Sequence, residues 1–178
     1  MKLKQVSKIK VGLNSREVTK RNNNKYTAEN LEEDLLTGYK IEGKKETTDD
    51  AITQAGDLIF SLMTKKAAIV SLKNSHMTLS QIYLKLTIDY KMIDPWFLCF
   101  ILNESQNIDH QFHKIMEGTV SKRITKNNLE DIDIDFPDIN IQKKIGAIYR
   151  LYLKQTKLTE KKNKLVKKFL FTSLEKIS

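Results

Sequence analysis

The sequence has little of the material from which several classes of protein are built. It holds one cysteine, two prolines and six glycines in 178 residues. A single cysteine leaves no disulfide framework, thiolate metal cluster or redox pair. We expect Cys99, which lies in the apolar run WFLCFIL, to be a buried and unreactive thiol. No window reaches the roughly 18 uninterrupted apolar residues of a membrane span, so we expect a cytoplasmic protein.

Catalytic signatures are also lacking. The stretch DPWF at 94–97 has the start of the base-holding loop of amino-methyltransferases, but the second proline and a Gly-rich turn are missing, which favours a helix cap. His110 and His113 share a helical face without a third ligand at a suitable spacing. No Ser/His/Asp set, phosphate-cradling loop or nuclease pattern stands out. We therefore expect no enzyme, no cofactor and no metal site.

The charge of the chain is concentrated at its end. The net charge is +9, and residues 141–178 hold eleven Lys and Arg against two Glu, which accounts for all of it. A basic surface of this kind attracts polyanions, nucleic acid first, although a Lys-rich helix is equally compatible with a solvated face. With 40% apolar and 30% charged residues, the rest is typical of one folded domain plus an extension.

Alternating and apolar segments before residue 138 predict a β-rich domain. We expect a strand over 1–12, a loop over SREVTKRNNNKYT, and turns with short strands, such as Tyr39 to Ile41, over 31–50. AGDLIFSLMT and KKAAIVSLK predict two strands with Lys65 and Lys66 at the tip between them. Residues 79–89 predict a strand with one apolar face, made by Ile82, Leu84, Leu86 and Ile88.

The next segments predict two helices and a last strand. Asp94 followed by Pro95 is typical of a helix start, and Gly118 of the end of a second short helix. A basic turn follows, and then a strand with Ile132, Ile134 and Phe136 on one face.

From Ile139 onward the apolar period changes to that of a coiled coil. Two series are spaced by seven and offset by three: Ile148, Gln155, Lys162, Phe169 at position a, and Leu151, Leu158, Leu165, Thr172 at position d. A helix of this length extends on the order of 50 Å and needs a partner to cover its stripe. We therefore expect an α+β chain, with a mixed, β-rich domain over 1–138 and one long coiled-coil helix over 139–178. The residues expected to make a homodimer are Ile148, Leu151, Leu158, Leu165 and Phe169.

Predicted loops mix cations with small polar side chains, the types that bind phosphates and read base edges. Surface solubility alone is an equally good explanation for any one of them. The candidate DNA-binding residues are Arg16, Lys20, Arg21, Lys65, Lys66, Lys73, Asn74, Ser75, Lys122 and Arg123.

The order of these pieces resembles the specificity (S) subunits of type I restriction-modification systems, in a half-length form. The resemblance rests on VGLNSR, AGDLIFS, DPWFLCFILN, MEGTVSKRIT, the alternating isoleucines and FPDINIQKKI, which occur in the family's order over nearly the whole chain. It departs at Phe136-Pro137 and Ile141-Gln142, where the family shows Pro-Pro and Glu-Gln.

The resemblance implies a target recognition domain that reads a half-site in double-stranded DNA, followed by a spacer helix. It further implies a non-catalytic subunit that assembles with methyltransferase (M) and restriction (R) subunits. Two such chains paired through antiparallel helices would read two inverted half-sites at a fixed spacing. The alternatives are a coiled-coil interaction adaptor and the recognition piece of a fused methyltransferase-nuclease.

Overall fold

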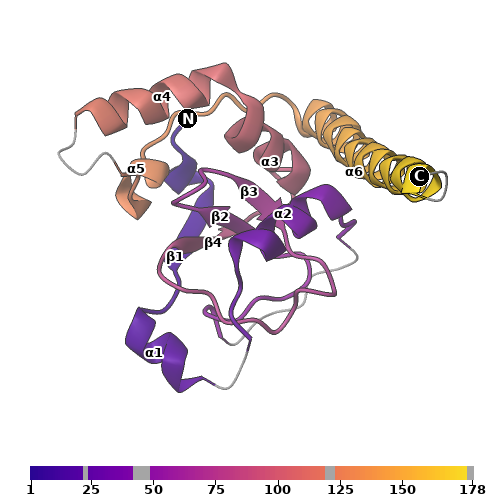
Figure 1. Ribbon diagram of the computed structural model, residues 1–178. Coiled ribbons are helices and arrows are strands. Elements are labelled where there is room, and N and C mark those ends of the chain that lie inside the picture. Colours follow the sequence, from indigo (N-terminus) through magenta and orange to yellow (C-terminus); the bar gives the residue numbers. More distant parts are fainter. Residues whose placement is uncertain (22–23, 42–48, 119–122, 176–178) are drawn as a thin grey trace.

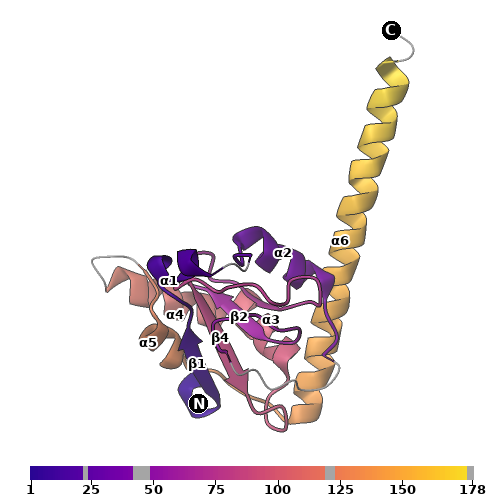
Figure 2. The same cartoon turned by 90° about the horizontal axis from the view of Figure 1, so that it is seen from below.

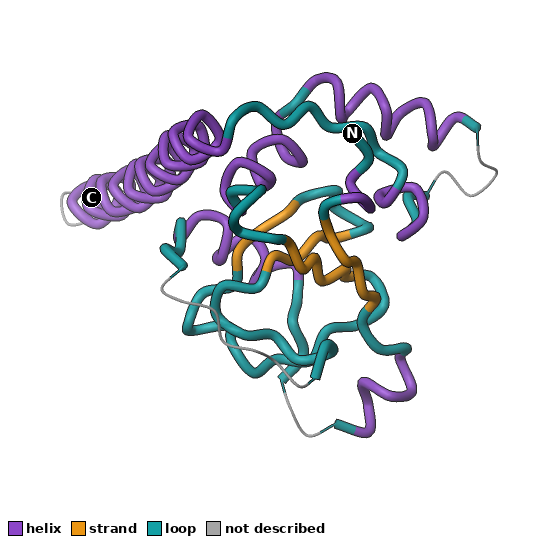
Figure 3. Tube along the Cα trace, turned by 180° about the vertical axis from the view of Figure 1, so that it is seen from behind, coloured by secondary structure: helices purple, strands orange, loops and turns teal. Residues whose placement is uncertain are grey.

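The computed structural model describes residues 1–21, 24–41, 49–118 and 123–175. Its centre is an antiparallel four-stranded sheet in the order β1-β4-β2-β3, drawn in orange in Figure 3. The strands are β1 (Ser7–Val11), β2 (Leu58–Ser61), β3 (Ala67–Ile69) and β4 (Tyr83–Ile88). The expected hairpin over AGDLIFSLMT and KKAAIVSLK is confirmed, and so is the α+β class.

Both faces of the sheet are covered, which is why β2 and β3 are buried along their whole length. Leu58 and Phe60 point into the larger core, with α3 (Pro95–Glu104) and α4 (Gln106–Glu117), while Ile59 points into a second core with α2 (Ala28–Thr37). In Figure 1, α4 lies above the sheet and α1 (Ser15–Lys20) below it. The caps expected for the two helices after β4 are confirmed at Asp94 and Gly118.

The apolar face predicted for residues 79–89 holds in part. Leu84, Leu86 and Ile88 share the larger core, but Ile82 packs against the second core because β4 begins one residue after it. Between these apolar positions, Lys85 is 4% exposed, and its Nζ lies 2.6 Å from Asp57 Oδ2 and donates to Ile52 O at 3.1 Å. A buried cation in the sheet is thus paired and hydrogen-bonded.

The loop predicted over 15–27 is wrong for its first six residues, which form α1, and the turns and short strands predicted from residue 31 are wrong as far as Thr37, where α2 ends. Each helix starts with a capping box, in which Asn14 and Thr27 accept from the backbone N–H three residues on. Some of the polar residues that suggested loops are therefore the caps of these two helices. No strand forms at Tyr39 to Ile41, where Trp96 Nε1 donates to Tyr39 O at 2.9 Å.

The strand predicted at 132–136 was also wrong. A short helix, α5 (Lys126–Glu130), precedes it, and the segment makes only an isolated bridge between Asp133 and Lys2. It is nevertheless extended beside the chain start: Leu3 N donates to Ile132 O at 3.0 Å. Ile132 and Ile134 are buried as the alternation indicated. The first residues, expected as strand, form a 3-10 turn over Leu3–Gln5 before β1.

The last element, α6 (Ile139–Glu175), is a single 37-residue helix, as predicted. Its first turns are anchored by Gln142, Gly146, Tyr149 and Leu153, all buried. Gln142 ties the helix start to its surroundings, since its Nε2 donates to Met92 O at 3.1 Å and Pro137 O at 2.8 Å. Leu153 is the last buried residue of the helix, and Lys157 makes its last hydrogen bond to the globule, at Thr37. Beyond it the helix extends away from the globule (Figure 2). This free part, residues 158–175, is roughly 27 Å long at 1.5 Å per residue.

Candidate nucleic-acid interface

The helix α1 presents two predicted DNA-binding cations to solvent. Arg16 and Lys20 are exposed and four residues apart, so they lie on one helical face. Arg21, just after the helix, donates from Nη1 to Asp49 Oδ2 at 2.5 Å. That hydrogen bond, together with one from the Ala51 backbone, lowers the pKa of Asp49. Arg21 is thus oriented by a carboxylate, while the other two cations are accessible to phosphate.

The loop between β3 and β4 holds three further candidates. Lys73 Nζ lies 2.5 Å from Glu33 Oε1 on α2, with the lysine side chain 72% exposed. Ser75 Oγ donates to Leu72 O at 2.7 Å. His76 beside it has φ 63, a left-handed conformation that costs energy for a residue with a Cβ. The loop over 71–77 therefore has a defined shape with an exposed cation on it.

Asn74, also a predicted DNA-binding residue, is buried and has a structural role. It is 1% exposed, and its Nδ2 donates to Asp34 Oδ1 at 2.9 Å. Asp34 is itself buried and accepts from Tyr26 Oη at 2.7 Å and Ser71 N at 3.0 Å. Burial raises the pKa of Asp34 in spite of these bonds. The amide of Asn74 is therefore used to fix the 71–77 loop on α2.

The remaining candidates lie elsewhere on the globule. Lys65, at the β2–β3 tip, has φ 57 and is half-buried. Lys66 turns toward the end of α3, where its Nζ donates to Asn103 O at 2.8 Å and lies 3.7 Å from Glu104. Arg123 is exposed before α5, and Lys122 lies outside the described residues.

The structure brings the α1 cations and the 71–77 loop to the same side of the sheet. The segment 49–53 connects them. Arg21 donates to Asp49, Thr53 N donates to Met77 O at 2.8 Å, and Thr53 O accepts from His76 N at 2.7 Å. We call this side, with α1, the 71–77 loop and α2, the α2 face. Lys66, by contrast, faces α3.

A surface that the loop-based prediction missed runs along α6. The heptad positions c and g between residues 143 and 168 are all Lys or Arg, apart from Ala147. We call these residues the basic edge: Lys143, Arg150, Lys154, Lys157, Lys161, Lys164 and Lys168. Extending the heptad register to its flanking positions would have revealed the edge from the sequence.

The predicted pairing stripe is uncovered in the single chain. Exposed fractions are 68% for Ile148, 61% for Leu151, 67% for Leu158, 57% for Leu165 and 71% for Phe169. Residues two apart on a helix differ by roughly 200°, so Ile148 and Leu151 point away from the buried Gly146 and Tyr149. The globule therefore covers one face of α6 and leaves the opposite, apolar face open.

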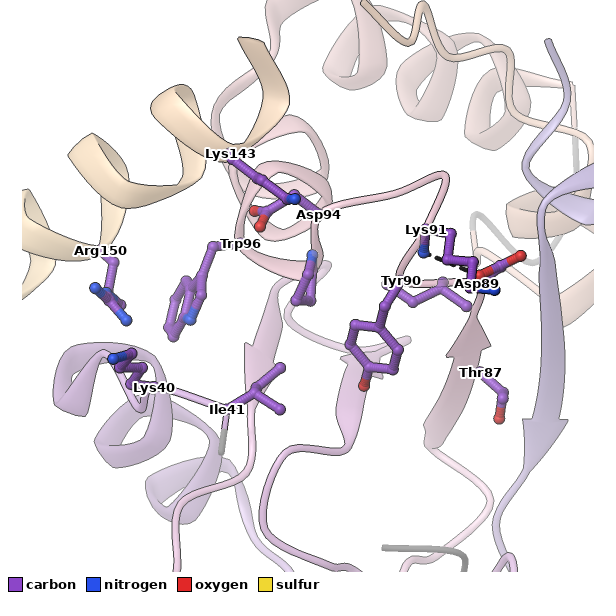
Figure 4. Close-up of a pocket in the computed structure, with 12 residues that line it drawn as sticks. Lys40, Ile41, Thr87, Asp89, Tyr90, Lys91, Asp94, Trp96, Lys143 and Arg150 are labelled. Carbon is purple, nitrogen blue, oxygen red and sulfur yellow. Dashed lines mark hydrogen bonds between the residues drawn. The ribbon is translucent and has the colours of Figure 1, made fainter. Parts of the chain in front are cut away.

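An open pocket of about 830 Å³ lies where α6 meets α3 and the segments 40–41 and 87–91 (Figure 4). Lys143 and Arg150 reach it from α6, and Asp94 and Asp89 line it too. Asp94 is engaged as the cap of α3, accepting from Phe97 N at 2.8 Å. The lining therefore holds charges of both signs, and one of its carboxylates is engaged in capping α3.

Two further observations concern the described part of the chain. Within it, no three His, Cys, Asp or Glu side chains group as metal ligands, and no helix is long and apolar enough to cross a membrane. Cys99 is buried as expected, and burial raises the pKa of its thiol well above the usual value. It is therefore a core residue of α3.

Comparison with known families identifies the class to which this architecture belongs. A family model described as the type I restriction modification DNA specificity domain matches residues 1–168. The chain belongs to this family, which confirms the resemblance noted in its sequence motifs. No curated protein matches it.

Solved structures share the fold. The HsdS subunit of Thermoanaerobacter tengcongensis is 16% identical with a TM-score of 0.53, covering 92% of this chain and 38% of its own length. The S subunit of a type I restriction-modification system from M. genitalium is 16% identical with a TM-score of 0.56, covering 96% and 42%. A third structure, from a study of the assembly of a type I R-M system, is 16% identical with a TM-score of 0.56. The match covers 99% of this chain and 42% of the other. The chain thus spans about two fifths of the length of these proteins.

Proposed function

We propose that this chain is a non-catalytic specificity subunit of a type I restriction-modification complex, which reads one half-site in double-stranded DNA. The observation that carries the proposal is the family match over residues 1–168. The α2 face supports it physically, because it gathers exposed Arg16, Lys20 and Lys73 on loops and a short helix fixed by buried contacts. Cations on such supports position a protein on phosphates, and neighbouring polar groups read bases.

The uncovered stripe supports a role for α6 in pairing two copies. An apolar row on the helix face opposite the globule forfeits roughly 1.5 to 3 kcal/mol of transfer energy for each large side chain left in water. A second copy that packs its own stripe there, in antiparallel orientation, covers both rows with one symmetric interface. The two globules then lie at opposite ends, and the length of α6 sets the spacing of two inverted half-sites.

Recruitment of methyltransferase and restriction subunits completes the proposed role. The chain then supplies sequence recognition, and catalysis belongs to the partners. Support comes from the family itself and from surface that the pairing stripe does not use, such as the exposed Leu170, Phe171 and Leu174 at the distal end of α6.

Selection of duplexes from a randomised pool by the purified chain tests the reading of DNA and the pairing together. We expect the unaltered chain to enrich an inverted repeat with a constant spacer. Leu158→Glu places a charge in the centre of the stripe, so this variant should be monomeric by light scattering and enrich a single half-site. Asn163→Glu adds the same charge at an exposed position outside the stripe, and should behave as the unaltered chain.

Each other outcome has a defined meaning. A chain that enriches no sequence is not a DNA-reading subunit, and binding only to an acidic protein would make it an adaptor. A chain that enriches single half-sites and is monomeric without any substitution would read DNA but would not pair through α6.

A further inference from the structure

Most cations of α6 lie on one side of the helix: seven of the ten between residues 139 and 175 occupy c and g positions. Cations fill the c and g positions of the basic edge, while the b and e positions on the other side hold no charged residue between 145 and 173. Those uncharged residues are Ile145, Tyr149, Tyr152, Thr156, Thr159, Asn163, Val166, Leu170 and Ser173. Lysines that only kept the helix in solution would be expected on both sides.

The basic edge is continuous with the α2 face of the globule. Lys157 Nζ donates to Thr37 Oγ1 at 2.9 Å, on the same face of α2 as Glu33, which holds Lys73. The hydrogen bond from Lys73 lowers the pKa of Glu33, and the charge of Lys157 adds to this effect. A Cβ added at Gly38 would meet Arg150 and Lys154, which places them at the end of α2 as well. Lys157 of the edge thus lies one turn of α2 away from Glu33, the residue that holds Lys73 of the 71–77 loop.

Pairing doubles this charge on one side of the assembly. A two-fold axis perpendicular to an antiparallel helix pair places the same edge of both helices on the same side. The exposed cations of the free part of each helix, Lys161, Lys164 and Lys168, would then form one basic surface between the two globules. The other four cations of the edge, which lie beside the globule, would continue it at each end. If both globules hold one duplex by their α2 faces, the DNA between the half-sites runs along this surface.

We propose that the basic edge of α6 binds the phosphate backbone of the spacer DNA, so that the helix is part of the DNA-binding surface as well as the link between two reading heads. This inference rests on the proposed function, because it requires a duplex held by the globules. Phosphate fits the edge better than a protein partner does: between residues 150 and 168 its members are all Lys or Arg, and Lys is depleted in protein–protein interfaces. A row of cations without apolar side chains is what a polyanion requires.

The test is the salt dependence of binding to a fluorescent duplex of about 30 mixed-sequence base pairs. The variant Lys161→Gln, Lys164→Gln, Lys168→Gln removes three exposed cations from the free part of the helix. Each lost phosphate contact lowers the slope of log K against log salt by about 0.9. We therefore expect the slope to fall by up to about 2.7 per chain, with circular dichroism and dimer mass unchanged.

A matched variant controls for net charge. Lys2→Gln, Lys4→Gln, Lys114→Gln removes the same charge from a surface that contains Asp131 and Asp133, where Lys4 Nζ lies 2.7 Å from Asp131. Its slope should stay that of the unaltered chain. A helix variant with the same slope as the unaltered chain overturns the inference, and so does an equal fall in both variants. Failure of the unaltered chain to bind any duplex would instead reject the proposed function.

Discussion

Several residues that carry the family resemblance fix contacts between elements of the fold. A side chain at Gly12 would come within 2.6 Å of Leu79 O, so only glycine fits there. Asn103 accepts from Ala67 N at 2.6 Å and donates to Ala67 O at 2.9 Å, which ties α3 to the start of β3. Gln142 likewise ties the start of α6 to the segments before it, through Met92 O and Pro137 O. Such motifs identify the architecture, but they do not show which residues read bases.

Gly146 gives a residue-scale prediction in which packing opposes helix propensity. A Cβ there would lie 2.8 Å from Phe97 N and 3.0 Å from Trp96 Cβ, because α6 crosses the start of α3 at this point. Gly146→Ala should therefore lower the free energy of unfolding by about 1–3 kcal/mol in urea denaturation. In a free helix, the same change would raise it by about 1 kcal/mol.

The neighbouring exposed Ala147 supplies the control. Ala147→Gly should cost about 1 kcal/mol through propensity alone. A Gly146→Ala protein more stable than the unaltered chain would show that the close crossing of α6 and α3 is not present in solution.

Arg21 gives a prediction about protonation. Its hydrogen bond is the main cause of the lowered pKa of Asp49, so Arg21→Gln should raise that pKa in an NMR titration of the carboxyl carbons. A carboxyl with a lower pKa in the folded chain stabilises the fold above its unfolded pKa, and this contribution is lost as the pH falls. Since the two side chains are 36% and 43% exposed, the stabilisation is at most about 1 kcal/mol.

Arg16→Gln is the control for this titration. It removes an equal charge from an exposed residue of α1 that is not among the groups lowering the Asp49 pKa, and should leave that pKa nearly unchanged. Equal shifts in both variants would mean that general charge, and not the Arg21 hydrogen bond, sets the titration. If Arg21 turns to a phosphate on binding, DNA should raise the Asp49 pKa in the unaltered chain.

At the scale of elements, periodicity predicted what composition did not. The hairpin, α3, α4 and α6 follow from apolar spacing and from caps at Asp94 and Gly118. Helices α1 and α2 were missed because their polar sequences resemble loops, although Asn14 with Glu17 and Thr27 with Asn30 are capping boxes. The burial of Asn74 depends on tertiary contact with Asp34, more distant in sequence than any local pattern reaches.

At the scale of the whole molecule, the proposed pairing makes a prediction: if two copies pair along α6, the free length of the helix sets the distance between half-sites. Inserting a second copy of the heptad 155–161 after Lys161 keeps the stripe in register and lengthens the pair by about 10.5 Å. At 3.4 Å per base pair, selection from a randomised pool should yield a spacer about three base pairs longer.

A two-residue insertion at the same place is the control. It rotates the distal part of the stripe by roughly 200° relative to the rest, so pairing should weaken and the constant spacer should be lost. An unchanged spacer after the seven-residue insertion would mean that something other than α6 sets the distance.

The basic edge has a consequence for when two copies meet. In an antiparallel pair it would place lysines of one chain beside lysines of the other, a repulsion that dilute salt screens only in part. Phosphates bound along the two basic edges would remove that repulsion. Two such chains would then dimerise more readily on a duplex than in its absence, so that DNA itself would promote assembly of the dimer that binds it.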